Sequence, residues 1–108
     1  MKTGDIILVP YPFAELSNVK VRPAVVITTT KDKYQDIIVS AISSVLHGKT
    51  GNFEILLKPN KTNNLRTISI IKVDRIVTLK EEDVITVLGK LSLSELKIFQ
   101  RKFKALID

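Results

Sequence analysis

The sequence contains no cysteine and a single histidine, His47, among its 108 residues. The lack of cysteine excludes disulfide bonds, thiolate zinc sites and cysteine nucleophiles, and it is typical of a reducing compartment. The acidic residues show no spacing that resembles a metal-binding loop. We therefore expect no metal site, no cofactor and a cytoplasmic location. A Ser-His-Asp triad through His47 is formally possible, but a histidine in a glycine turn is more typical of a surface residue.

Glycine and proline are also scarce, at four residues each. So few glycines exclude a phosphate-binding loop of the P-loop or dinucleotide type. The segment "MKTGDIILVP" at the start does not have the pattern of a signal peptide, and no apolar run is long enough to cross a membrane. We expect no membrane partner.

The chain is rich in hydrophobic residues and carries a net positive charge. Its length and its 44% content of hydrophobic residues suit one folded domain over residues 1–108. The net charge of +6 favours an anionic partner such as nucleic acid, an acidic protein segment or anionic lipid. The basic residues are dispersed along the chain, so any basic patch has to be assembled by folding.

Short runs of apolar and β-branched residues predict strands at 5–9, 21–30, 36–43, 53–57, 67–79 and, more briefly, 86–91. Polar turns separate most of them. The segment at 10–20 is longer and contains two prolines, and loops of that length in a small domain are often functional. "KEED" at 80–83 is consistent with a single helical turn.

One helix is predicted at the C-terminus. Ser92 and Glu95 have the spacing of a capping box, which marks its start. Apolar residues at helical spacing predict a buried stripe, and basic residues on another face are expected to be solvated. The stripe consists of Leu96, Phe99, Phe103 and Leu106, and the basic face of Lys97, Arg101 and Lys104. The fold class is therefore mostly β with a C-terminal helix, arranged as a small half-open antiparallel barrel.

Arg22 is the strongest candidate for a functional residue, because it precedes Pro23 where the long loop meets an apolar strand. A guanidinium on a stiff scaffold can present a fixed fork to a phosphate, although an arginine at a strand start is more often simply solvated. The hydroxyls of Ser43 and Ser44 could donate to a phosphate, and Tyr11 and Phe13 could stack on bases. Turn chemistry and barrel packing are the ordinary alternatives for these residues. The residues alone favour a nucleic-acid binder only slightly.

Five segments together resemble the MazF/PemK family of toxins from type II toxin–antitoxin systems. They are "GDIILVPYPF", "VRPAVVI", "VSAISS", "SIIKVDRIVTL" and "LGKLS", in the family's order and over nearly the whole chain. The resemblance implies an SH3-like barrel of the MazF/CcdB-like type. It also implies a homodimeric endoribonuclease, an mRNA interferase, that cuts single-stranded RNA without a metal. The partner would be a cognate antitoxin, which in such systems is typically acidic and partly disordered.

The family's catalytic arginine matches Arg22, and its catalytic threonine falls on Ser43, where serine keeps the hydroxyl but loses the β-branch. The family's additional arginine near Val77 is missing, and Arg75 could substitute for it by strand alternation. In this mechanism the RNA 2′-hydroxyl attacks the adjacent phosphate and leaves a cyclic phosphate. Because arginine stays protonated in proteins, we assign Arg22 the stabilisation of charge. The residues expected to contact RNA are Phe13, Ser17, Lys20, Ser44, Ser69 and Arg75.

Two other functions stay open at this point. The fold is shared with CcdB-type toxins, which poison DNA gyrase by binding and catalyse nothing, and fold alone does not decide function. Those toxins act mainly through C-terminal residues, whereas "KALID" here is typical of the end of a core helix. The serine at position 43 also permits a degenerate, inactive relative.

Overall fold

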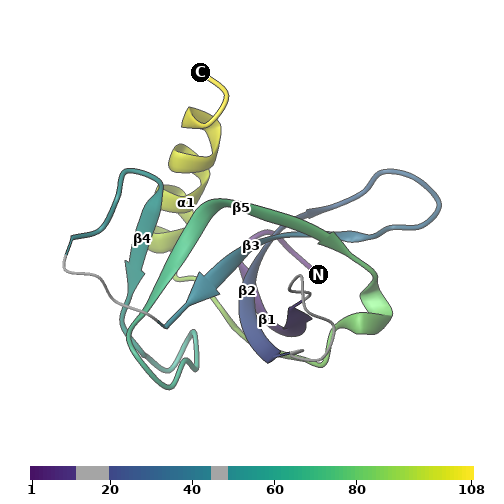
Figure 1. Ribbon diagram of the computed structural model, residues 1–108, viewed down its shortest axis with the longest axis horizontal. Coiled ribbons are helices and arrows are strands. Elements are labelled where there is room, and N and C mark those ends of the chain that lie inside the picture. Colours follow the sequence, from purple (N-terminus) through teal and green to yellow (C-terminus); the bar gives the residue numbers. More distant parts are fainter. Residues whose placement is uncertain (12–19, 45–48) are drawn as a thin grey trace.

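The structure is a computed structural model that describes residues 1–11, 20–44 and 49–108. The described residues form six strands, one α-helix and one short 3₁₀ turn (Figure 1). The strands are β1 (Asp5–Tyr11), β2 (Lys20–Thr29), β3 (Ile37–Ser43), β4 (Glu54–Leu57), β5 (Ser69–Leu79) and β6 (Thr86–Lys90). The 3₁₀ turn, Glu81–Asp83, precedes β6, and α1 (Leu93–Ala105) follows it. Every predicted element is confirmed, with boundaries shifted by at most two residues.

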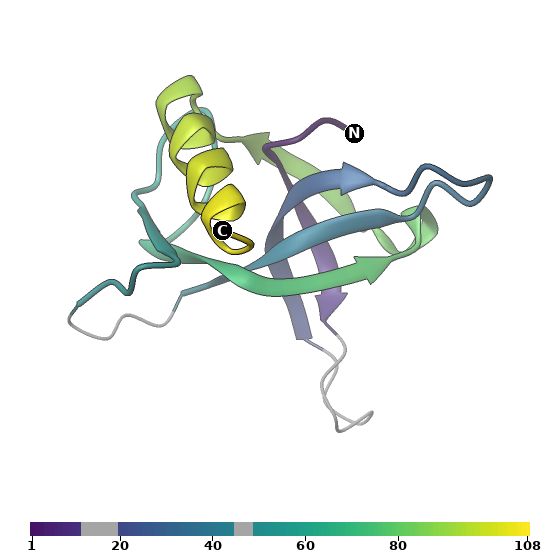
Figure 2. The same cartoon turned by 90° about the horizontal axis from the view of Figure 1, so that it is seen from above.

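All strands belong to one antiparallel sheet in the order β4-β5-β3-β2-β1-β6. The sheet curls strongly, and α1 packs against it beside β5 (Figures 1 and 2). The architecture is the predicted half-open barrel with a C-terminal helix. None of the described helices is long and apolar enough to cross a membrane.

The strands bury side chains on both faces of the sheet, which explains their nearly continuous apolar runs. Ile6 belongs to the hydrophobic cluster under α1, whereas Ile7 and Val9 belong to a second cluster on the opposite face. All three side chains are fully buried. A strand buried on both faces lacks the polar alternation of a half-exposed strand.

The helix begins where the capping box predicted it. The Ser92 hydroxyl accepts a hydrogen bond from the Glu95 backbone N–H (3.2 Å), and the Ser92 N–H donates to the Glu95 carboxylate (2.8 Å). Phe99, in the middle of the predicted stripe, is 1% exposed. The predicted basic face is exposed at all three positions: Lys97, Arg101 and Lys104.

Strand β5 is interrupted, which the sequence did not indicate. Ala41 of β3 pairs with Lys72, but its neighbour Ser40 pairs with Ile76, so three residues of β5 have no partner on β3. The buried Ser40 hydroxyl donates to the Val73 carbonyl in this interruption (2.9 Å). The irregularity is of the β-bulge kind, which bends a strand and helps a sheet to curl.

The turn between β2 and β3 is organised by an aspartate. The Asp32 carboxylate accepts hydrogen bonds from the Thr30 hydroxyl (2.8 Å) and from the backbone N–H groups of Tyr34 and Gln35. The Thr30 hydroxyl is the largest influence that lowers the pKa of Asp32 below its ordinary value, because these donors favour the charged form. The "KDKYQ" segment is thus a specific turn that fixes the register of the hairpin.

Candidate functional site

Strands β2 and β3 separate at the Arg22–Pro23 pair. The last residue pair between them, among the described residues, is Ala24 with Ala41. Beyond it β2 pairs with β1 alone, Pro23 opposite Leu8 and Arg22 opposite Val9. Because proline has no N–H to donate, it is tolerated where one side of a strand is unpaired. The proline therefore lies at the point where the sheet opens.

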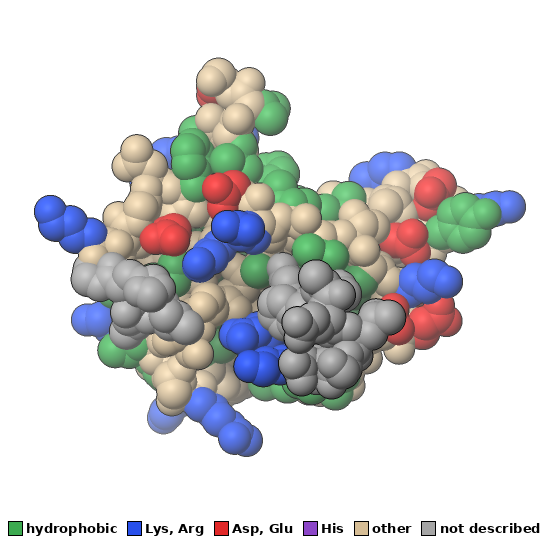
Figure 3. Space-filling view, in the orientation of Figure 1, with side chains coloured by type: hydrophobic (Ala, Val, Ile, Leu, Met, Phe, Trp, Pro, Cys, Tyr) green, Lys and Arg blue, Asp and Glu red, His purple; other side chains and the backbone are tan. Residues whose placement is uncertain are grey.

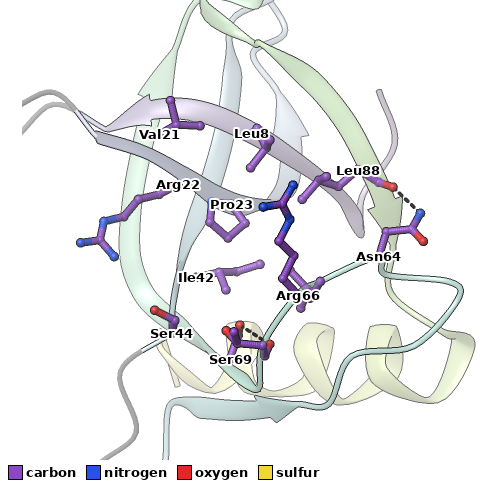
Figure 4. Close-up of a pocket in the computed structure, with 12 residues that line it drawn as sticks. Leu8, Val21, Arg22, Pro23, Ile42, Ser44, Asn64, Arg66, Ser69 and Leu88 are labelled. Carbon is purple, nitrogen blue, oxygen red and sulfur yellow. Dashed lines mark hydrogen bonds between the residues drawn. The ribbon is translucent and has the colours of Figure 1, made fainter.

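A cavity of about 430 Å³ fills this opening (Figure 4). Its walls come from the separated ends of β2 and β3, from β1 and β6, and from the loop that connects β4 to β5. The lining residues are Leu8, Val21, Arg22, Pro23, Ile42, Ser44, Asn64, Leu65, Arg66, Thr67, Ser69 and Leu88. Its volume lies in the range of about 300–1,000 Å³ that is usual for ligand sites.

The lining of the cavity combines an apolar wall with positive charge and hydroxyl groups. Among the described residues, the lining includes two arginines, Arg22 and Arg66, and neither aspartate nor glutamate. Figure 3 shows Lys and Arg side chains near the middle of this face, with acidic side chains directly above and to the left of them and at the right-hand end. The described residues contain no cluster of three or more His, Cys, Asp or Glu side chains that could hold a metal ion. The cavity is thus suited to an anion that carries an apolar or aromatic part.

Arg22 lies at the rim of the cavity. Its side chain is half-buried and its Nε atom is buried. Figure 4 shows the guanidinium pointing away from Pro23 and Ile42. An arginine whose stem is embedded in the sheet loses little further freedom when it binds an anion, so it can act as a preorganised charge.

The two serines predicted at the end of β3 face different directions. Ala24 and Ala41 are directly opposite each other, and Arg22 and Ser43 each lie two residues further toward the opening. Side chains two apart on a strand share a face, so Arg22 and Ser43 lie on the same face of the sheet. Ser43 is half-buried and does not line the cavity, whereas the exposed Ser44 does.

The other predicted site residues are only partly brought together. Ser69 lines the cavity and is 3% exposed, with its hydroxyl donating to the Thr67 carbonyl (3.0 Å). Lys20 is exposed at the start of β2 and does not line the cavity. Arg75 is exposed in the interrupted part of β5, where it has no partner residue on β3, and it does not line the cavity.

Three residues singled out in the sequence, Phe13, Ser17 and His47, lie outside the described residues.

The sequence did not indicate the wall formed by the β4–β5 loop, which contributes Asn64, Leu65, Arg66 and Thr67 to the cavity. The sequence predicts only a polar turn after the fourth strand. Its signal was the asparagine-rich run "NKTNN", because asparagine is favoured where side chains bond the backbone and where φ is positive. Asn64 does adopt a positive φ of 55°.

Gly89 of β6 explains why this loop can reach the cavity. A β-carbon at Gly89 would lie 2.2 Å from the Thr62 carbonyl oxygen and 3.0 Å from that of Asn63. Only glycine leaves room for the loop backbone to approach β6 this closely. The "LGKLS" motif therefore has a structural role in placing the loop at the site.

The sequence and the structure were compared with known proteins. A family model described as "PemK-like, MazF-like toxin of type II toxin-antitoxin system" matches residues 2–107. No curated protein matches the sequence significantly.

Two solved structures are similar in fold. One, "Endoribonuclease in complex with its cognate antitoxin from Mycobacterial species", has a TM-score of 0.73 at 11% identity and covers 97% of this chain and 92% of its own. The other, "Mycobacterium tuberculosis toxin MazF-mt6", has a TM-score of 0.67 at 17% identity and covers 96% of both chains. The match over nearly all of its length shows that this chain belongs to the family of PemK-like, MazF-like toxins of type II toxin–antitoxin systems.

Proposed function

We propose that the protein is an endoribonuclease toxin that cleaves single-stranded RNA, in particular mRNA, without a metal ion. The observation that carries the proposal is the half-buried Arg22 at the opening between β2 and β3, with the hydroxyl-bearing Ser43 at the matching position of the next strand. A fixed guanidinium beside a hydroxyl donor is the arrangement that stabilises extra charge on a phosphoryl group. The similar fold of an endoribonuclease supports the same reading.

In the proposed reaction the 2′-oxygen of a ribose forms a bond to the adjacent phosphorus, and the bond from phosphorus to the 5′-oxygen breaks. The proton of the 2′-hydroxyl passes to a base, and the leaving 5′-oxygen takes up a proton. The products are a 2′,3′-cyclic phosphate and a 5′-hydroxyl, and no oxidant or other reactant is consumed. DNA lacks the 2′-hydroxyl, so it would bind but would not be cut.

Arg22 is assigned the stabilisation of negative charge on the phosphoryl oxygens as the transition state forms. Ser43 is assigned the second donor, because it lies on the same face as Arg22. Loss of one such donor typically lowers kcat by about 10²–10³. Lys20, Ser44, Ser69 and Arg75 remain proposed RNA contacts, of which Ser44 and Ser69 line the cavity.

The proposal extends to partners and organisation. We propose that the 108 residues form one toxin domain and that two copies form a homodimer. We propose in addition a cognate antitoxin with an acidic, partly disordered segment, which a basic groove of the dimer would suit. A solved structure of similar fold contains a cognate antitoxin, which supports the last point.

The test is cleavage of a long unstructured RNA of varied sequence in EDTA by the wild-type protein, by Arg22→Ala and by Arg101→Ala. Arg101 is exposed on α1 and lines no part of the cavity, so its replacement controls for the loss of one arginine. We expect discrete fragments from the wild type and from Arg101→Ala, and a decrease of at least about 10² in rate for Arg22→Ala. Intact RNA with all three proteins would rule out the ribonuclease and favour a toxin that acts by binding.

A further inference from the structure

The β4–β5 loop is held by a buried asparagine. Asn63 is 0% exposed, and its side-chain oxygen accepts hydrogen bonds from the N–H groups of Asn60 (3.0 Å) and Leu65 (3.0 Å). Its side-chain nitrogen donates to the Lys58 carbonyl (2.9 Å). One side chain thus satisfies three backbone groups of a loop that has no ladder of its own. The loop is therefore a fixed structural element.

The same loop is attached to β6. The Asn64 side chain donates to the Leu88 carbonyl (2.6 Å), and the Lys90 N–H donates to the Thr62 carbonyl (3.0 Å). The missing β-carbon at Gly89 allows this contact. Thr62 and Asn64, which precede Arg66 in the loop, are therefore held against β6.

Arg66 follows these anchored residues and lines the cavity. Its side chain is exposed, and within the described part of the chain it makes no hydrogen bond or ion pair. Figure 4 shows it extending from the loop toward Pro23 and Leu88, whereas Arg22 points outward from the opposite rim. Apolar side chains of Leu8, Pro23, Ile42 and Leu88 also line the cavity, and in Figure 4 Pro23 and Ile42 lie between the two arginines.

This order of groups corresponds to one nucleotide of a single strand, in which a base and sugar lie between two phosphates. A base can stack its face on an apolar wall, and a guanidinium donates two hydrogen bonds to a phosphate in bidentate geometry. The described lining residues include no acidic side chain beside Arg66, so an anionic ligand would supply the counter-charge for its guanidinium.

We propose that Arg66 is a substrate-positioning residue that binds the phosphate next to the one that is cleaved, with the intervening nucleotide seated on the apolar wall. The proposal rests on the ribonuclease function proposed above, and it assigns to the β4–β5 loop a role in holding RNA. Arg66 does not touch the reacting atoms in this proposal. Its loss is therefore expected to weaken binding much more than it slows the chemical step.

The first measurement is the binding of a random-sequence 2′-O-methyl RNA pool, which the proposed reaction cannot cleave. The logarithm of affinity for a single strand falls with the logarithm of salt concentration with a slope of about −0.7 for each phosphate contact. We expect Arg66→Ala to make the slope less steep by about 0.7 and to weaken binding roughly ten-fold. Arg66→Lys should recover the slope, because it restores the charge.

Lys61→Ala is the matched control, because Lys61 is an exposed cation of the same loop that does not line the cavity. We expect its slope to stay at the wild-type value. A slope for Arg66→Ala equal to that of the wild type, or an equal change with Lys61→Ala, would overturn the proposal. Circular dichroism of each variant, together with the uncharged Arg66→Gln, distinguishes loss of contact from loss of fold.

The second measurement is cleavage of unmodified RNA. Arg66→Ala is expected to raise KM roughly ten-fold with kcat changed less than three-fold, whereas Arg22→Ala lowers kcat. A fall in kcat with KM unchanged would overturn the positioning role. If the wild type does not cleave RNA, the proposed function fails, while the binding experiment still decides whether Arg66 contacts a phosphate. If Arg66→Ala weakens binding of poly-glutamate and leaves RNA binding unchanged, Arg66 serves a protein partner and the proposal is wrong.

Discussion

Arg22 and Pro23 act together, and the structure gives a physical reason for the pair. Proline lacks a backbone donor, and it lies at the position where β2 loses β3 as a neighbour, which is where a strand tolerates it. Arg22 is then the second residue of β2 beyond its pairing with β3, and it still pairs with Val9 of β1. The Arg22 side chain therefore lies at the opening of the sheet, and its half-buried aliphatic part packs against the strand.

The hydroxyl donor that assists Arg22 could be either Ser43 or Ser44, and replacing each of them in turn distinguishes the two. If Ser43 assists Arg22, we expect Ser43→Ala to lower kcat by about 10²–10³, because one donor to the transition state is lost. Ser44→Ala should lower kcat/KM by roughly ten-fold or less, since its loss removes only a contact to bound RNA. Rates of RNA cleavage under single-turnover conditions measure both effects.

Ser43→Thr is the matched control for that comparison. Threonine keeps the hydroxyl and adds the β-branch that restricts its rotamer, so activity should be at least that of the wild type. A larger loss from Ser44→Ala than from Ser43→Ala would show that the cavity side of β3 supplies the donor, and it would move the assignment to Ser44.

At the scale of elements, the sequence predicted what depends on local patterns. The start of α1 follows from a capping box within four residues, and the strand cores follow from β-branched runs. The interruption of β5 was missed because it depends on Ser40 of another strand, whose hydroxyl satisfies the Val73 carbonyl. The substitution of Arg75 for an arginine near Val77 therefore stays a prediction.

The site was predicted in part for the same reason. Arg22 and Ser44, which line the cavity, were predicted from their positions at strand ends, and Ser69 was predicted after the family resemblance. Arg66 was missed because its place in the cavity depends on contacts between the β4–β5 loop and β6, which are about 25 residues apart in the chain. Single-sequence patterns carry little information on such contacts.

The buried Asn63 makes the stability of this loop testable. Asn63→Ala leaves two backbone N–H groups and one carbonyl without their partner, so we expect unfolding free energy to fall by about 2–3 kcal/mol. Urea unfolding followed by circular dichroism measures the change. Asn52→Ala, at an exposed position, should stay within about 0.5 kcal/mol of the wild type. A loss from Asn63→Ala no larger than that of the control would mean that the loop is not held by this side chain.

At the scale of the whole molecule, charge and exposed apolar surface point to different partners. The basic residues outnumber the acidic ones by 17 to 11, which favours an anionic ligand. By contrast, Ile85, just before β6, is 54% exposed, and Val87, in β6, is 52% exposed. Strand β6 is an edge of the sheet, and natural edge strands usually carry charge or are covered. A second copy of the chain is the partner we expect to cover this edge.

We therefore predict a molecular mass in solution of twice 12.1 kDa, measured by sedimentation equilibrium over a range of concentrations. Val87→Lys should shift the protein to the monomer, because a charge would have to be buried at the covered edge without a partner. Thr86→Lys is the matched control, because it adds the same charge at an exposed neighbour whose side chain lies on the opposite face of β6. A wild-type monomer at every concentration would disprove the dimer. Equal masses for the wild type and Val87→Lys would place the interface away from β6, since only an edge that is covered in the dimer responds to a charge at that position.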